Sequence, residues 1–238
     1  MKFYRSLNPI KAISFDLDDT LYSNHTNMVA AEQAMVCYFA EQLSTYADSD
    51  KVFDYRYWRT YRKQVITQSP AVGHDVTELR RQTYLQGIVA LGVDSDTALQ
   101  LAQNALAFFL AKRSDFKVPQ ESKDLLAYLS ARVPLVAISN GNVDMQAIGL
   151  DQYFSHAFLA GEGRLKKPAD DMFLRASDAL QLPLKNILHV GDCGHADIKG
   201  ALGAGMMTAW LSCYDVGKPI SVLPHLELTA VTQLDQLL

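Results

Sequence analysis

The order of short apolar runs along this 238-residue chain limits it to few folds. Runs at residues 12–15, 135–139, 187–190 and 207–211 are each bounded by polar residues or glycine, and residues 156–160 are a further candidate. Segments in which apolar residues recur at helical spacing lie between the later runs. Strands that alternate with helices form parallel sheets covered on both faces. The sequence therefore predicts an α/β core.

A helical insertion is predicted after the first run. From about residue 22 to 115 apolar residues recur at three-to-four spacing, as at Leu99, Ala102 and Leu106, and no convincing buried strand occurs. The four predicted helices span residues 26–46, 51–67, 75–91 and 97–112, with a turn at 48–50. We expect a catalytic core of residues 1–21 and 116–238, with residues 22–115 as an inserted four-helix cap domain.

One Asp-x-Asp pair differs from the others in its setting. Asp16 and Asp18 directly follow an apolar run, whereas the pairs at 48–50 and 94–96 fit turns or helix caps. Side chains alternate along an extended backbone, so Asp16 and Asp18 are able to point the same way. They would do so at the carboxyl end of a parallel strand, where open α/β sheets bind ligands.

A later run also ends in a carboxylate, Asp192, and Asp197 follows five residues on. Clustered carboxylates repel one another, and a hard divalent cation is the usual compensation. Because no His or Cys cluster accompanies them, they favour Mg²⁺ over zinc. The alternative for Asp192 is a cap on the following helix.

Two further segments fit phosphate binding. Ser139 ends an apolar run, and its hydroxyl with the backbone N–H groups of Asn140 and Gly141 suits phosphate oxygens, although an ordinary Asn-Gly turn is the alternative. Lys167 precedes Pro168, which is predicted to lie in the first turn of a helix. The helix dipole does not favour an ammonium group there, so nearby aspartates and a phosphate are a plausible reason for it. A solvated basic loop is the alternative.

These motifs together resemble the haloacid dehalogenase-like (HAD) hydrolase superfamily. The order is Asp-x-Asp-Asp-Thr at 16–20, Ser-Asn-Gly at 139–141, Lys-Pro at 167–168 and Gly-Asp-x-x-x-x-Asp at 191–197. The resemblance implies a Rossmann-like core with a helical cap. Within the superfamily the chain looks most like bacterial flavin mononucleotide phosphatases, which also act on the phosphorylated ribitylaminouracil precursor of riboflavin. Residues 1–7, 74–77 and 223–227 contribute to that closer match.

The resemblance also implies roles for the strand-end residues. Asp16 would be the nucleophile that forms an aspartyl phosphate, and Asp18 the general acid and base. The Asp16 side chain, the Asp18 backbone carbonyl and the Asp192 side chain would hold Mg²⁺. Thr20 would support the loop. Because the family's dehalogenases lack the second aspartate as acid and base, Asp18 favours phosphate esters over carbon–halogen bonds.

The remaining motif residues would contact the phosphoryl group. Ser139, Asn140, Gly141 and Lys167 would bind its oxygens, with Ser139 and Lys167 stabilising charge during transfer. Asp197 would orient Lys167 or a metal-bound water from behind. The predicted partner is therefore a small phosphorylated metabolite.

Composition narrows the remaining partners. A net charge of −4 gives no general attraction to nucleic acid or to an anionic membrane. No apolar run approaches the roughly 18 residues of a membrane span, and three cysteines without a C-x-x-C pair fit a reducing compartment. We expect a cytoplasmic monomer or weak homodimer that binds neither nucleic acid nor membrane.

Specificity within the cap is left open by the sequence. The stretch at 55–63 is aromatic and basic; a helix with one packed face is favoured over nucleic-acid binding, and a ring stacked on a flavin or pyrimidine is a third possibility. His74 and Asp75 either face the site or begin a helix. Other nucleotide or sugar phosphates are alternative substrates. A non-catalytic binding protein of this fold is a less favoured alternative function.

Overall fold

The computed structural model describes residues 1–48, 51–213 and 221–238, so part of the predicted turn at 48–50 lies outside the described residues. The chain divides into two compact units. The sheet unit comprises Met1–Asn24, Lys117–Gly141 and Met145–Leu238, and the helical unit comprises His25–Phe116 and Asn142–Asp144.

The sheet unit is built on seven strands in the order β1-β7-β6-β5-β2-β3-β4. Neighbouring strands are parallel except β1, which pairs antiparallel with β7. The strands are β1 (Lys2–Phe3), β2 (Ala12–Phe15), β3 (Leu135–Ser139), β4 (His156–Leu159), β5 (Ile187–Gly191), β6 (Met207–Leu211) and β7 (Leu226–Leu228). The central strands β2, β3 and β5 are buried along their whole length, as expected for a sheet covered on both faces.

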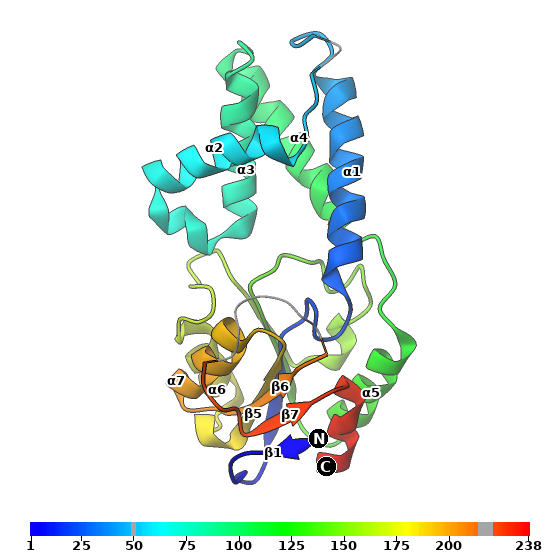
Figure 1. Cartoon of the computed structure of the whole chain (residues 1–238), viewed down its shortest axis with the longest axis vertical. Helices are drawn as coiled ribbons and strands as arrows, with labels where there is room; N and C mark the ends of the chain where they lie inside the picture. Colours follow the sequence, from blue (N-terminus) through cyan, green and yellow to red (C-terminus); the bar gives the residue numbers. More distant parts are fainter. Residues whose placement is uncertain (49–50, 214–220) are drawn as a thin grey trace. The chain divides into compact units, whose positions relative to one another are not determined.

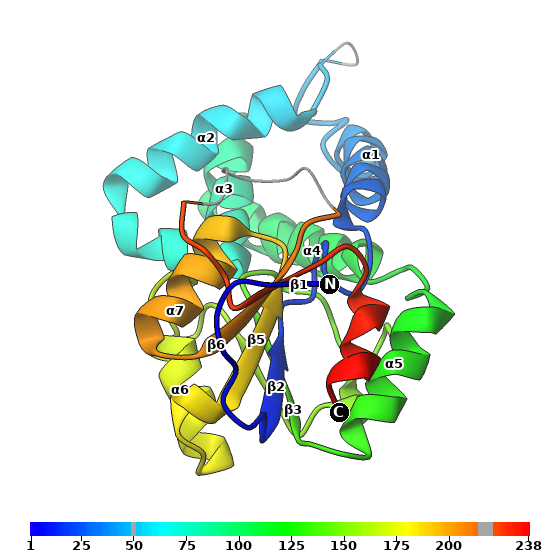
Figure 2. The ribbon, with the colours of Figure 1, turned by 60° about the horizontal axis from the view of Figure 1, so that its bottom comes forward.

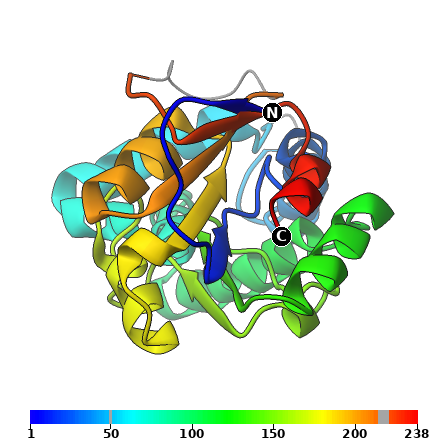
Figure 3. The same cartoon turned by 90° about the horizontal axis from the view of Figure 1, so that it is seen from below.

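Helices cover this sheet on both sides (Figures 2 and 3). α6 (Asp171–Leu180) and α7 (Gly200–Ala204) lie on one face, and α5 (Gln120–Ser130) lies on the other with the C-terminal 3₁₀ helix (Val231–Leu237). Under α6 the apolar side chains of Phe173 and Ala176 pack in one buried cluster with Ile138. The predicted α/β core with a mainly parallel sheet is confirmed.

The edge strand β1 and its neighbour β7 were missed by the sequence analysis. They hold two and three residues, too few to form a recognisable apolar run. The glycine-rich stretch at 200–205 forms the end of a helix: α7 stops at Gly205, whose φ of 100° favours glycine. Among the described residues no helix is long and apolar enough to cross a membrane.

The helical unit is formed mainly by the helices α1 to α4, which Figure 1 labels. They are α1 (Asn24–Gln42), α2 (Tyr55–Gln68), α3 (Val76–Val89) and α4 (Ser95–Arg113), with a 3₁₀ turn at Pro70–His74. Asp54, Asp75 and Asp94 cap α2, α3 and α4 by accepting backbone N–H bonds. Asp75 therefore begins a helix, and the Asp-x-Asp pair at 94–96 is a helix cap as predicted.

Aromatic rings hold the core of the helical unit together. Trp58 of α2 packs against Phe39 of α1 at 4.3 Å between ring centroids and against Tyr84 of α3 at 5.1 Å. All three side chains are buried. The aromatic and basic stretch at 55–63 is thus a helix with one packed face, which was the favoured interpretation.

Candidate active site

Three predicted site residues meet because their strands are neighbours. β2 pairs with β3 on one side and with β5 on the other. Asp16 directly follows β2, Ser139 is the last residue of β3, and Asp192 directly follows β5. The Asp16 N–H continues the ladder by donating to the Val190 carbonyl at 2.9 Å. The carboxyl edge of the sheet therefore carries all three, as expected for an open α/β fold.

The chain turns sharply after Asp16. The N–H groups of Thr20 and Leu21 both donate to the Leu17 carbonyl, and Asp19 adopts a left-handed φ of 56°, which aspartate tolerates better than most residues. The Thr20 side chain is buried, and its hydroxyl donates to Asp192 Oδ1 at 3.4 Å. Thr20 thereby links the loop after β2 to the carboxylate after β5.

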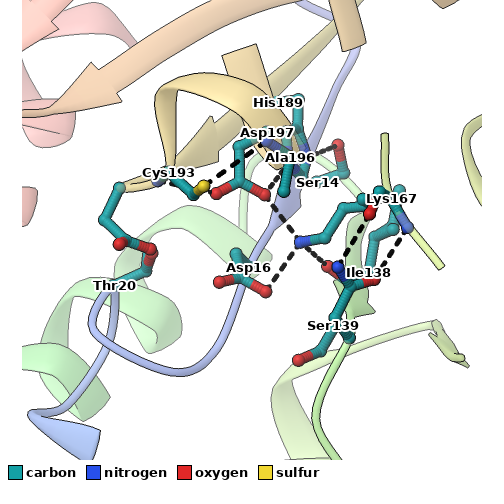
Figure 4. A network of polar contacts seen from close by, with 12 residues as sticks. Ser14, Asp16, Thr20, Ile138, Ser139, Lys167, His189, Cys193, Ala196 and Asp197 are labelled. Atoms are coloured by element: carbon teal, nitrogen blue, oxygen red, sulfur yellow. Dashed lines mark hydrogen bonds and ion pairs between the residues drawn. The ribbon is translucent and has the colours of Figure 1, made fainter. Parts of the chain in front are cut away.

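Lys167 lies at the centre of a network of polar contacts (Figure 4). Its Nζ is 2.7 Å from Asp16 Oδ1, 2.7 Å from Asp197 Oδ1 and 2.6 Å from the Ile138 carbonyl. The three contacts use the whole donor capacity of the ammonium group. A phosphoryl oxygen would therefore bind Lys167 by replacing one of these acceptors.

The predicted position of Lys167 at a helix N-terminus is wrong. α6 begins at Asp171 and is preceded by Asp170, so Pro168 is not in its first turn. Instead, Asn140 fixes the Lys167 backbone: Asn140 Nδ2 donates to the Lys167 carbonyl at 2.9 Å, and Asn140 Oδ1 accepts the Lys167 N–H at 2.7 Å. The Asn140 side chain is thus engaged, and its backbone N–H is what is left for a phosphate.

Gly141 allows Asp18 to approach the loop after β3. A Cβ atom at position 141 would lie 2.5 Å from Asp18 Oδ2, so a larger residue would displace that carboxylate. The Gly141 N–H donates to Ser139 Oγ at 3.1 Å, and the Ser139 side chain is buried. Asp18, Ser139 and Gly141 therefore lie together, although their roles stay predictions.

The site holds more negative than positive charge. Burial, together with the neighbouring carboxylates of Asp197 and Asp16, raises the pKa of Asp192 to about 8. Burial also raises the pKa of Asp16 to about 7, since the opposing effect of the Lys167 charge is only partial. Lys167 contacts Asp16 and Asp197 but not Asp192, and this excess of buried carboxylates favours binding of a cation.

The donor atoms fit a divalent metal ion. Carboxylate oxygens of Asp16, Asp192 and Asp197 all lie within 4.8 Å of one another. Asp197 is already engaged, because its Oδ2 accepts the Cys193 N–H at 2.9 Å and its Oδ1 contacts Lys167. Asp16 and Asp192 are consequently the better placed ligands, and an all-oxygen set suits Mg²⁺.

The alternative of Asp192 as a helix cap is wrong. The turn that follows, a π-helical segment at Gly194–Lys199, is capped by Cys193, whose Sγ accepts the Ala196 N–H at 3.4 Å. The Asp192 backbone carbonyl accepts the indole N–H of Trp210 at 2.8 Å. The Asp192 side chain accepts the Thr20 hydroxyl and lies near the carboxylates of Asp16 and Asp197.

His189 is a residue that the sequence analysis missed. It lies inside β5, is fully buried, and its Nε2 is 3.2 Å from Asp197 Oδ1, while its Nδ1 is 2.9 Å from Ser14 Oγ. Burial lowers the pKa of His189, so a neutral ring with Nε2–H donating to Asp197 and Nδ1 accepting from Ser14 fits both contacts.

His189 also helps to keep Asp197 ionised. Burial opposes ionisation of Asp197, but the Lys167 charge and the His189 hydrogen bond outweigh it and lower the pKa of Asp197 to about 2. In sequence His189 reads as one polar residue in an apolar strand. Only its spacing from Asp197 along the motif could have drawn attention to it.

Loss of the His189 hydrogen bond is expected to lower kcat. His189→Leu should reduce kcat about 10- to 100-fold, because Asp197 then loses a contact that orients it toward Lys167. His189→Gln is the matched control, since its amide N–H can still reach Asp197, and it should stay within several-fold of wild type. Steady-state kinetics on folded variants, checked by circular dichroism, test this; equal losses in both variants would contradict it.

The comparisons with known proteins agree with this geometry. A family model of haloacid dehalogenase-like hydrolases matches residues 10–205. The chain belongs to the haloacid dehalogenase-like hydrolase family. The match includes every strand-end residue described above and the whole helical insertion between Asp16 and Ser139.

Individual relatives extend the similarity to the full chain. The 5-amino-6-(5-phospho-D-ribitylamino)uracil phosphatase YigB of Escherichia coli is 34% identical and covers 100% of both chains. The N-acylneuraminate-9-phosphatase of Rattus norvegicus is 24% identical over 98% of this chain and 95% of its own. Family membership and these phosphatase relatives support phosphatase activity.

A solved structure is similar in fold over nearly the whole chain. The 2-haloacid dehalogenase from Pseudomonas syringae pv. Tomato DC3000 superposes with a TM-score of 0.88 at 31% identity, covering 95% of this chain and 97% of its own. Its name refers to the other chemistry found in the family, and a functional assay should therefore include a 2-haloacid.

Proposed function

We propose that this chain is a Mg²⁺-dependent phosphomonoesterase that acts on small phosphorylated metabolites through an aspartyl phosphate at Asp16. The observation that carries the proposal is the contact of the buried Asp16 carboxylate with Lys167, 2.7 Å away, at the end of the central strand. A carboxylate in contact with a buried ammonium group can attack an anionic phosphate, because the ammonium charge offsets the repulsion between the two anions.

The first half-reaction uses Asp16 and Asp18. Lys167 holds Asp16 Oδ1, which leaves Oδ2 to attack phosphorus. As the bond between Oδ2 and phosphorus forms, the bond between phosphorus and the ester oxygen breaks, and Asp18 gives its proton to the departing alcohol. Lys167, Ser139 and the N–H groups that follow Ser139 are proposed to stabilise the equatorial oxygens.

The second half-reaction regenerates the enzyme. Asp18, now ionised, takes a proton from a water molecule while the water oxygen attacks phosphorus. The bond between phosphorus and Asp16 Oδ2 breaks, and inorganic phosphate leaves. Asp197 and His189 act behind Lys167, because Asp197 contacts both the lysine and the histidine and neither Asp197 nor His189 needs to touch the substrate.

We propose Asp16, the Asp18 backbone carbonyl and Asp192 as the residues that hold Mg²⁺. The clustered carboxylate oxygens and the raised pKa of Asp192 support this assignment. Bound Mg²⁺ would supply positive charge that keeps Asp16 ionised and offsets the charge of the phosphate.

For the substrate, we propose flavin mononucleotide or the ribitylaminouracil phosphate. The support is the 34% identity with YigB of Escherichia coli over the full length of both chains. Few rings of residues 55–61 are available to stack on a substrate. Trp58 is buried, and the Tyr57 ring packs against it with 4.8 Å between the ring centroids. Tyr55, which is 62% exposed, is the ring in this stretch that is most open to a ligand.

A substrate panel is expected to rank these compounds among the best. We expect kcat/KM for flavin mononucleotide to exceed that for phosphoglycolate and a hexose phosphate by several-fold, because one stacked ring contributes about 1 kcal/mol. A pyrimidine nucleotide should fall between them. A last-place rank for flavin mononucleotide would refute this substrate but not the phosphatase, whereas turnover of a 2-haloacid without turnover of any phosphate ester would refute both.

A further inference from the structure

The helical unit contains a small pocket between α1, α2 and α3. Its volume is about 50 Å³. Because roughly 10–15 Å³ holds one water molecule, the pocket has room for a group of a few non-hydrogen atoms and not for a fused ring system. Its walls include Glu32, Trp58, Arg59, Arg62, Arg80 and Tyr84.

The single carboxylate of these walls is already paired. Glu32 Oε1 is 2.9 Å from Arg80 Nη2, and Arg80 Nη1 donates to the Tyr84 hydroxyl at 2.9 Å. The Arg80 guanidinium also lies over the Phe109 ring at 3.5 Å. Arg80 is therefore a fixed part of the wall, and its charge is matched by Glu32.

The two arginines of α2 are not matched in this way. Within the described part of the chain, neither Arg59 nor Arg62 has a hydrogen bond or ion pair to a carboxylate. Arg62 is half-buried, and burial followed by the nearby Arg80 charge lowers its pKa. Counting three arginines against Glu32, the walls carry two uncompensated positive charges.

We propose that this pocket binds a small oxyanion, a sulfate, phosphate or carboxylate group, through the guanidinium groups of Arg62 and Arg59. An oxyanion would relieve the repulsion between Arg62 and Arg80, and a planar guanidinium matches two of its oxygens at once. All wall residues belong to the helical unit. Sulfate binding can therefore be tested without relying on the function proposed for the sheet unit.

Sulfate is a suitable probe, and Trp58 is a built-in reporter in the pocket wall. The chain has two tryptophans, so Trp210→Phe leaves Trp58 as the sole one. In chelator, where uncompensated carboxylates repel anions from the sheet unit, sodium sulfate should change Trp58 fluorescence saturably. We expect a dissociation constant on the order of 1–10 mM, measured against sodium chloride at equal ionic strength.

Two variants in the Trp210→Phe background separate a built site from general charge. Arg62→Gln should weaken sulfate binding at least about tenfold. Arg56→Gln is the matched control, because Arg56 is an exposed arginine on the same helix that does not line the pocket, and it should leave binding unchanged. The absence of a saturable change beyond the chloride control, or equal effects of the two substitutions, would overturn the proposal.

Kinetics then identify the source of the anion. If the oxyanion belongs to a substrate, Arg62→Gln should lower kcat/KM at least about fivefold for a substrate with a second anionic group and leave p-nitrophenyl phosphate unaffected. If it is a free oxyanion, the substitution should act equally on both substrates or on neither, while sulfate binding is still lost. The fluorescence titration decides whether the pocket binds an oxyanion, and the kinetics decide whether that oxyanion belongs to a substrate or is free.

Discussion

Replacement of Asp16 with asparagine is expected to lower kcat at least about a thousandfold, a loss of about 4 kcal/mol of transition-state stabilisation. The amide is not a competent nucleophile, so no aspartyl phosphate can form. The fold should persist, because the amide oxygen can still accept the bond from Lys167, and one of several repelling charges at the site is removed. Steady-state kinetics together with thermal unfolding of both proteins measure the two expectations.

A second Asp-x-Asp pair provides the matched control. Asp94 caps α4 by accepting the Thr97 N–H at 3.0 Å, and asparagine caps a helix about as well as aspartate. Asp94→Asn should therefore keep both activity and stability. Near-normal turnover by a folded Asp16→Asn variant would contradict the covalent mechanism.

Removal of divalent metal is expected to abolish activity, and Mg²⁺ is expected to restore it. The reason is the cluster of buried carboxylates, whose repulsion and hard oxygen atoms suit this ion. Ca²⁺ should support activity poorly, because its larger and looser coordination would misplace the nucleophile. The measurement is turnover after dialysis against chelator, followed by titration of each ion. Full activity in excess chelator would refute the metal site.

The same carboxylates make the stability of the metal-free chain depend on pH. The pKa of Asp192 is about 8 in the folded chain, against an ordinary value of 3.8. The folded state therefore holds the proton more tightly, and this stabilisation is complete below about pH 4 and lost as the pH rises through about 8. We expect Tm in chelator to fall between pH 6 and pH 9, and Mg²⁺ to reverse the fall.

Asp192→Asn separates the two effects of this carboxylate. The variant should lose the response of Tm to Mg²⁺, yet in chelator at pH 9 it should unfold at least about 4 °C above wild type, because a buried uncompensated charge is gone. A Tm below that of wild type under these conditions would show that the Asp192 charge is compensated within the protein.

The parts of the site that were predictable from sequence are those set by strand ends. Asp16, Ser139 and Asp192 each follow or end a short apolar run, and adjacent parallel strands bring such positions to one edge. The helical insertion was recognisable because its apolar spacing repeats over several turns. Both patterns are local in the sequence, so they can be recognised without knowledge of the tertiary contacts.

The parts that were not predictable depend on contacts between distant residues. His189 is 175 residues from Ser14, and no pattern in either segment predicts the hydrogen bond between them. Pro168 in the sequence predicts a helix start beside Lys167, whereas a reciprocal pair of hydrogen bonds with Asn140 fixes the lysine backbone. The strands β1 and β7 are stabilised by pairing with each other and with β6, not by an apolar run of their own.

The most direct test of the central claim is to trap the phosphoryl group on the enzyme. Asp18→Asn should slow breakdown of the intermediate, because the base that activates water is gone, while a good leaving group such as p-nitrophenolate still departs. This variant is mixed with p-nitrophenyl phosphate and Mg²⁺, quenched in acid during turnover, and digested for peptide mass spectrometry. We expect a phosphoryl group on Asp16. A phosphoryl group on another residue, or none on the enzyme despite release of p-nitrophenolate, would contradict the proposed mechanism.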